Sequence, residues 1–140
     1  MTKTVGIRLV LGIAIAGVVC AFAVPPIAQN PDYHNFADRR ALFGIPNALD
    51  VLSNLPFLIV GARGLLFLKT RWNDEALFVN PSEKWPWLVL FGALALASFG
   101  SAYYHWEPSN SRLAWDRLFI ALTFMTLFAI IIAERIHDTP

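Results

Sequence analysis

Long apolar segments separated by short polar ones dominate the pattern of this chain. Four such segments can be read, at about residues 5–24, 47–68, 85–104 and 112–135. Each is close to the ~20 residues that an α-helix needs to cross ~30 Å of hydrocarbon. A helix satisfies its own backbone hydrogen bonds, so apolar segments of this length are expected to be helical in a bilayer. The pattern predicts an all-α fold, a polytopic transmembrane bundle of four spans in one membrane domain.

Aromatic residues and composition agree with a bilayer as the environment. Interfacial aromatics gather at the ends of membrane spans, and here they gather at the ends of the third and fourth segments: Trp85, Trp87, Tyr103, Tyr104, Trp106 and Trp115. The chain is 56% hydrophobic and only 15% charged, whereas soluble domains carry about 25% charged residues. The net charge of +1, with no basic run, gives no indication of a nucleic-acid partner.

The first segment has two interpretations. Lys3 and Arg8 followed by an apolar core and Ala21-Phe22-Ala23 are compatible with a cleaved signal peptide. The apolar core is long for that purpose, and Pro25 is poorly suited to a cleavage junction. A retained transmembrane helix is therefore the favoured prediction, with cleavage as the alternative.

The distribution of Lys and Arg predicts the orientation. With the N-terminus inside, the inner segments hold Lys3, Arg8, Arg63, Lys69, Arg71, Lys84 and Arg135, and the outer ones hold Arg39, Arg40, Arg112 and Arg117. The excess favours a cytoplasmic N-terminus, and we expect a bacterial inner membrane. In either orientation, the loops at 25–46 and 105–111 are predicted to lie on the same face, the outer one here.

Polar residues recur within the second segment. Asn47, Asp50, Ser53 and Asn54 are spaced i, i+3, i+6 and i+7, which on a continuous helix would form one polar stripe. Polar groups inside a span are costly against lipid, so this stripe is expected to face protein, water or an ion. Hydrogen bonds between helices are the alternative to a functional site.

The third and fourth segments carry a second polar group. Ser101 and His105 are spaced i, i+4 and so share a face at the end of the third segment, and Asp116 lies early in the fourth. A turn joins the two segments, and the fourth helix is expected to be capped by Ser109, Asn110 or Ser111. An antiparallel hairpin would bring Ser101, His105 and Asp116 together. The alternative is structural: an interfacial histidine, and an aspartate paired with Arg112 or Arg117.

These residues resemble the alkaline ceramidase family. The match is Ser101-x-x-x-His105 on one span with Asp116 eleven residues after the histidine on the next. Segments 35–39, 44–47 and 50–54 add to the resemblance to bacterial ceramidase-domain membrane proteins, which are related to adiponectin-receptor-like seven-helix hydrolases. The resemblance covers about residues 32–135.

The resemblance implies a zinc-dependent amide hydrolase that cleaves the N-acyl bond of a ceramide-like sphingolipid. His105 would be a zinc ligand, Asp116 would orient and deprotonate a water, and Ser101 would help to hold the oxyanion. Animal members bind calcium through an acidic cluster near the first core helix. Candidates for such a cluster or for the polar stripe are Asp32, Asp38, Asn47, Asp50 and Asn54, although the Asp-Trp-x-Glu pattern is absent.

The zinc site that the resemblance implies is incomplete here. The family completes it with a His-x-x-x-His pair on its last helix, which these 140 residues lack. A catalytic zinc generally takes three protein ligands, and the chain has only His34, His105 and His137, the last expected on the opposite face. We therefore expect the chain to correspond to the N-terminal half of the family.

Two other classes of function stay open. A non-enzymatic receptor or lipid-binding scaffold would keep the helices and lose the zinc ligands. A small four-helix transporter would use Asp50 or Asp116 as an intramembrane carboxylate. Bound zinc would distinguish the hydrolase from both, and a proton-coupled flux would identify the transporter.

Overall fold

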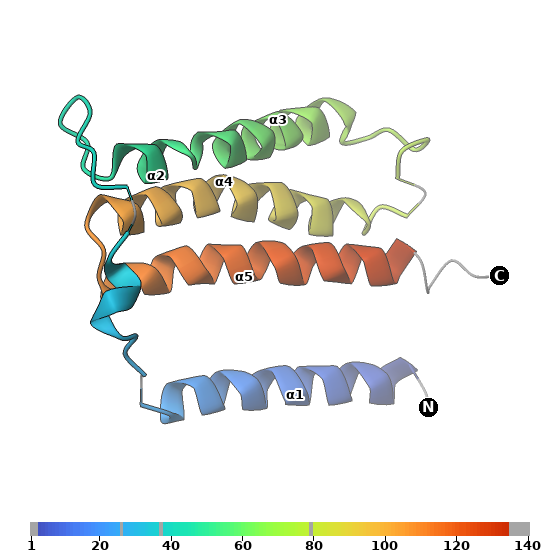
Figure 1. Ribbon diagram of the computed structural model, residues 1–140. Coiled ribbons are helices and arrows are strands. Elements are labelled where there is room, and N and C mark those ends of the chain that lie inside the picture. The colour runs from blue at the N-terminus through green and yellow to red at the C-terminus, as the bar shows by residue number, and fades with distance from the viewer. Residues whose placement is uncertain (1–2, 26, 37, 79, 135–140) are drawn as a thin grey trace.

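A computed structural model describes residues 3–25, 27–36, 38–78 and 80–134 (Figure 1). The elements are five α-helices and one short 3₁₀ helix: α1 (Lys3–Ala23), η1 (Pro31–His34), α2 (Ala48–Leu52), α3 (Leu55–Arg71), α4 (Lys84–Trp106) and α5 (Asn110–Ile132). No strand occurs in these ranges beyond one isolated bridge between Leu42 and Ile45. The predicted all-α class is confirmed.

Among the described residues, three helical segments are long and apolar enough to cross a membrane. They are α2 with α3 (Ala48–Arg71), α4 and α5. Large apolar side chains such as Phe99 and Phe124 lie on the outside of the bundle, 59% and 67% exposed, as expected for a protein solvated by lipid rather than water. The chain is therefore an integral membrane protein. The described apolar stretch of α1, Leu11–Ala23, is shorter than these three.

Helix α4 lies between α3 and α5 and packs against both, and α1 stands apart beyond α5 (Figure 1). The α3–α4 contact depends on small residues. A Cβ atom added to Gly61 would lie 2.6 Å from the backbone nitrogen of Ala95, and one added to Gly64 would overlap the ring of Phe91. Gly100 of α4 is similarly close to the backbone of Trp115 in α5. Such close backbone approach is typical of helix packing in membranes.

The predicted span at 47–68 corresponds to α2 with α3 (Ala48–Arg71), and its helix is interrupted locally between the two. The hydroxyl of Ser53 and the amide of Asn54 both donate to the carbonyl oxygen of Asp50, at 2.8 and 2.9 Å. Pro56 then enters the first turn of α3 without an N–H to donate. Side-chain bonds replace the backbone ladder here. Ser53 is exposed, whereas Asn54 is buried and Asn47 and Asp50 are half-buried, so Ser53 departs from the burial that the other members of the predicted stripe share.

The two loops predicted to share a face do lie at one end of the bundle. The segment between α1 and α2 and the α4–α5 turn are neighbours there, opposite the α3–α4 connection (Figure 1). The backbone N–H of Gln29 donates to the side chain of Asn110 at 2.9 Å. At the same turn Ser109 caps α5 by accepting the N–H of Arg112, which confirms one of the three predicted caps.

Candidate site at the α4–α5 end of the bundle

Buried polar side chains collect at the end of the bundle where α4 and α5 are joined. Ser98 and Ser101 on α4 and Asp116 on α5 are 4%, 8% and 7% exposed. The hydroxyl of Ser98 donates to the backbone carbonyl of Asn54 at 2.8 Å and so links α4 to the α2–α3 interruption. Two of the three residues singled out by the Ser/His/Asp spacing, Ser101 and Asp116, are therefore inside the bundle rather than facing lipid.

His105 lies near the end of α4 and is half-buried. Its ring packs against Phe36, with centroids 4.6 Å apart, and its backbone carbonyl accepts the amide of Asn47 at 2.8 Å. The ring nitrogen Nδ1 is buried and has no hydrogen-bond partner among the described residues.

Asp116 is the second residue with an unused atom. Its Oδ1 is buried and unpartnered in the described part of the chain. The two arginines expected as structural partners are engaged elsewhere: Arg112 bonds to the carboxylate of Glu107, and Arg117 donates to the hydroxyl of Tyr33. Within the described ranges, the ion pairs do not include Asp116. The geometry therefore gives no support to an Asp116 that serves only to pair with an arginine.

His34 is brought to this site although its sequence position assigned it no role. It ends η1, and its Nδ1 lies 2.9 Å from the hydroxyl of Tyr104, which is 3% exposed and precedes His105. Its Nε2 is buried without a partner among the residues described. For His34, the sequence indicated that residues 25–46 lie on the same side of the membrane as the α4–α5 turn. The packing of η1 against α4, which brings His34 to the site, was revealed by the structure.

Asp38 takes part in local structure. One carboxylate oxygen accepts the N–H of Leu49 at 2.9 Å, and the other accepts the Arg40 guanidinium at 2.7 Å. Asp38 thereby caps the first turn of α2, although it lies eleven residues before Leu49 in the sequence. The hydrogen-bonded Arg40 guanidinium lowers the pKa of this carboxyl below its ordinary value of 3.8, and the N–H of Leu49 acts in the same direction, against the effect of burial.

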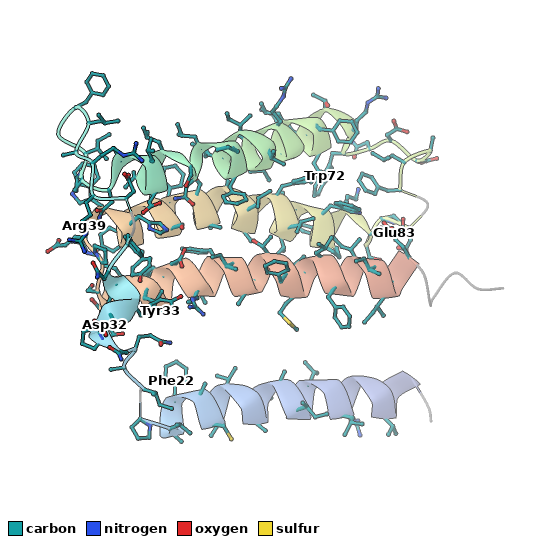
Figure 2. All side chains as sticks on the ribbon, viewed as in Figure 1. Phe22, Asp32, Tyr33, Arg39, Trp72 and Glu83 are labelled. Carbon is teal, nitrogen blue, oxygen red and sulfur yellow. The ribbon has the colours of Figure 1, made fainter. Side chains whose placement is uncertain are left out.

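The other candidates for a calcium site or a polar stripe are dispersed. Asn47 and Asn54 use their amides to bond backbone carbonyls of His105 and Asp50. Asp50 is half-buried within α2, and Asp32 is exposed in η1 (Figure 2). The structural alternative, hydrogen bonding at helix ends and between helices, therefore accounts for the two asparagines.

The unpartnered atoms, His34 Nε2, His105 Nδ1 and Asp116 Oδ1, are of the kinds that bind zinc. Nevertheless, the described residues contain no group of three His, Cys, Asp or Glu side chains placed to hold a metal ion. The residues present thus do not form a complete zinc or calcium site by themselves. His137 lies outside the described residues.

A scan against protein-family models, a search of curated proteins and a search of solved structures each found no match for this chain. The geometry of this site, and the resemblance carried by Ser101, His105 and Asp116, are therefore the basis for a functional proposal.

Proposed function

We propose that this protein contributes helices to a zinc-dependent amide hydrolase similar to alkaline ceramidases, which acts on N-acyl sphingolipids. Ser101, His105 and Asp116 would be its contribution to the active site. The observation that carries the proposal is that His105 Nδ1 and Asp116 Oδ1, at the positions singled out by the family's spacing, are buried without partners among the residues that the structure describes.

Buried polar atoms without partners are uncommon because each one loses its hydrogen bonds to water. Two such atoms on neighbouring helices favour a site that binds something over a purely structural hairpin. A buried carboxylate such as Asp116 can take a proton from a water in the reaction. The Ser101 hydroxyl, one helical turn before His105, can donate to an oxyanion.

The metal requirement limits what this chain would do alone. His105 would be one ligand, and the proposal requires at least two more, which would come from His34 Nε2, from residues outside those described or from a second copy. We expect the chain as printed to bind zinc weakly. Near-stoichiometric zinc retained by the purified chain after mild chelation would contradict this expectation.

In the proposed topology α1 is a fourth span, retained in the mature protein. The N-terminus is in the cytoplasm, and the site faces outside a bacterial inner membrane. The support is the uncharged run from Leu9 to Ala23 within α1 and the excess of Lys and Arg on the inner side.

The decisive experiment uses a version extended by a helix with a His-x-x-x-His pair and measures fatty-acid release from N-acyl sphingosine. His105→Ala should abolish both zinc binding and turnover. Asp116→Asn should keep zinc, while turnover falls by ~10²-fold or more through loss of the general base. Ser101→Ala should have a smaller effect on turnover.

Ser98→Ala is the matched control, since Ser98 lies on the same helix, is equally buried and bonds only a backbone carbonyl. It should leave turnover near the unsubstituted rate. An Asp116→Asn protein that keeps its full rate would refute the catalytic role, and so would an extended protein that binds zinc and releases no fatty acid.

A further inference from the structure

Arg117 is a charged residue inside an apolar helix, and it directly follows the buried Asp116. It is exposed and lies seven residues after Asn110, about 10 Å along the helix axis from the start of α5. An arginine within a span is costly unless its charge is balanced or reaches the interface. No carboxylate pairs with it in the part of the chain that the structure describes.

The contact of Arg117 with Tyr33 leaves most of its hydrogen-bonding capacity unused. One guanidinium nitrogen donates to the Tyr33 hydroxyl, and the guanidinium carbon lies 5.6 Å from the ring centroid. A guanidinium has five N–H donors, and phenol is a neutral partner. Figure 2 shows Tyr33 beside the first turns of α5, near the end of α1 that carries Phe22. The arginine is held in place but its charge is not neutralised.

An open surface pocket of about 390 Å³, called the cavity below, adjoins this arginine between α5 and the segment that leaves α1. Its apolar lining includes Ile27, Leu113 and Ala114, and its polar lining comprises Gln29, Asn110 and Arg117. No residue of α1 lines it, and α1 stands apart from α5 (Figure 1). The volume lies in the range of small-ligand sites, and apolar walls with a single cation suit an amphiphile with a negative headgroup.

We propose that this cavity binds the anionic headgroup of a membrane amphiphile, with Arg117 as its cation. The headgroup's phosphate or carboxylate would accept N–H groups of Arg117, whose planar fork suits either anion. Its first methylenes would lie against Leu113 and Ala114. Arg117 lies about 10 Å from one end of α5, and an arginine side chain at that position extends toward the interface rather than staying at the bilayer centre.

This ligand is distinct from the substrate proposed above. An N-acyl sphingosine is neutral and gives Arg117 no charge to pair with. The inference does not depend on hydrolysis, because it requires only that α5 spans the membrane and that the cavity is reached from lipid. Its test therefore needs no activity measurement.

The test uses the full chain in a neutral detergent with equal amounts of dioleoylphosphatidylglycerol and dioleoylphosphatidylcholine, and counts bound lipids by native mass spectrometry. One phosphatidylglycerol per chain should be retained, and the bound amount of this lipid should exceed that of phosphatidylcholine by about fivefold. A preference of this size corresponds to the attraction of one cation for an anionic lipid. Adding oleate distinguishes the two sources of negative charge. If oleate at equal concentration displaces phosphatidylglycerol, the site accepts a carboxylate. If oleate does not displace it, the site is specific for a phosphate.

Five variants separate the effect of charge from the effect of shape. Arg117→Gln should remove the preference, and Arg117→Lys should keep part of it, which guards against simple misfolding. Arg112→Gln is the control for charge, since Arg112 lies on the same helix outside the cavity and pairs with Glu107. Ala114→Phe should fill the cavity and block binding with all charges intact.

Ala121→Phe is the control for size, because Ala121 is an exposed residue of α5 outside the cavity. This variant should retain phosphatidylglycerol as the unsubstituted chain does. Equal retention of both phospholipids by the unsubstituted chain would overturn the proposal. An anionic preference that survives Arg117→Gln or Ala114→Phe would overturn it as well.

Discussion

The ring nitrogen Nδ1 of His34 lies 2.9 Å from the hydroxyl of Tyr104, and this bond ties the segment before α2 to the end of α4. The two residues are seventy positions apart in the sequence, and their rings also meet edge to face at 5.8 Å. Tyr104 is almost fully buried and is followed directly by His105. The pair therefore helps to fix the position of the helix end that carries the candidate site.

Removing this bond should weaken the fold by a measurable amount. Tyr104→Phe keeps the buried ring but loses the hydroxyl, so the free energy of unfolding in detergent should fall by about 1 kcal/mol. Tyr103→Phe is the control, because Tyr103 is exposed on the neighbouring position. In a double-mutant cycle, His34→Ala and Tyr104→Phe should be non-additive. Additive effects would show that the contact contributes no stability.

The α3–α4 interface should be intolerant of a single methyl group at Gly61. A Cβ there meets the backbone of Ala95 and Phe91 at 2.6–2.9 Å, and backbone cannot move aside as a flexible side chain can. Gly61→Ala should lower stability by about 1–3 kcal/mol, the usual cost of overpacking. Gly92→Ala is the control, since nothing lies within 4 Å of its added Cβ. Equal thermal melting of both variants would argue against the close packing of α3 and α4.

The long helices were predictable because length and apolar content alone specify a membrane span. The expected boundaries 85–104 and 112–135 compare with Lys84–Trp106 and Asn110–Ile132. The cap at Ser109 was also predictable, since a serine before an apolar run is a local signal. For α1 the helix was predicted, but its crossing of the membrane remains part of the proposal.

The interruption at Ser53 and Asn54 and the position of His34 were not predictable in the same way. The interruption depends on the side chains of Ser53 and Asn54, which both donate to the backbone carbonyl of Asp50. The periodicity of apolar residues carries no information on such bonds. The position of His34 depends on the path of a loop, which is set by tertiary contacts such as that with Tyr104. At the site, sequence spacing identified Ser101, His105 and Asp116, whereas their burial and unused atoms required the structure.

The arrangement of the helix ends predicts which positions are reached from the same side of the membrane. On a Cys20→Ser background, Ala41→Cys and Ser111→Cys should both react with an impermeant thiol reagent added to one side. Asn73→Cys, in the α3–α4 connection, should react only from the other side. Labelling of positions 41 and 111 from opposite sides would contradict the hairpin that forms the candidate site.

Stability should decline in acid partly through Asp38. Its pKa in the folded protein is lowered by the Arg40 guanidinium, so the folded state favours the ionised form. The contribution to stability is therefore fully present above the ordinary pKa of 3.8 and is lost as the pH falls through the lower, folded value. Thermal melting of Asp38→Asn should depend less on pH in this acidic range than that of the unsubstituted chain.

Asp116 and Asp38 are both buried carboxylates, and a comparison of the two separates a functional acid from a structural one. Asp38 has partners for both oxygens, whereas Asp116 Oδ1 has none among the described residues. Asp38→Asn should therefore lower the melting temperature at neutral pH, because it weakens bonds to Arg40 and Leu49. Asp116→Asn should leave it unchanged or raise it, since residues retained for function often cost stability.

Thermal melting in one detergent at one pH gives both values, with circular dichroism confirming equal helix content before heating. Because the experiment needs neither zinc nor substrate, it tests Asp116 apart from the identity of the reaction. If Asp116→Asn destabilises the protein as much as Asp38→Asn does, Asp116 is a structural residue of the α4–α5 hairpin. The catalytic interpretation of Ser101, His105 and Asp116 would then lose its general base.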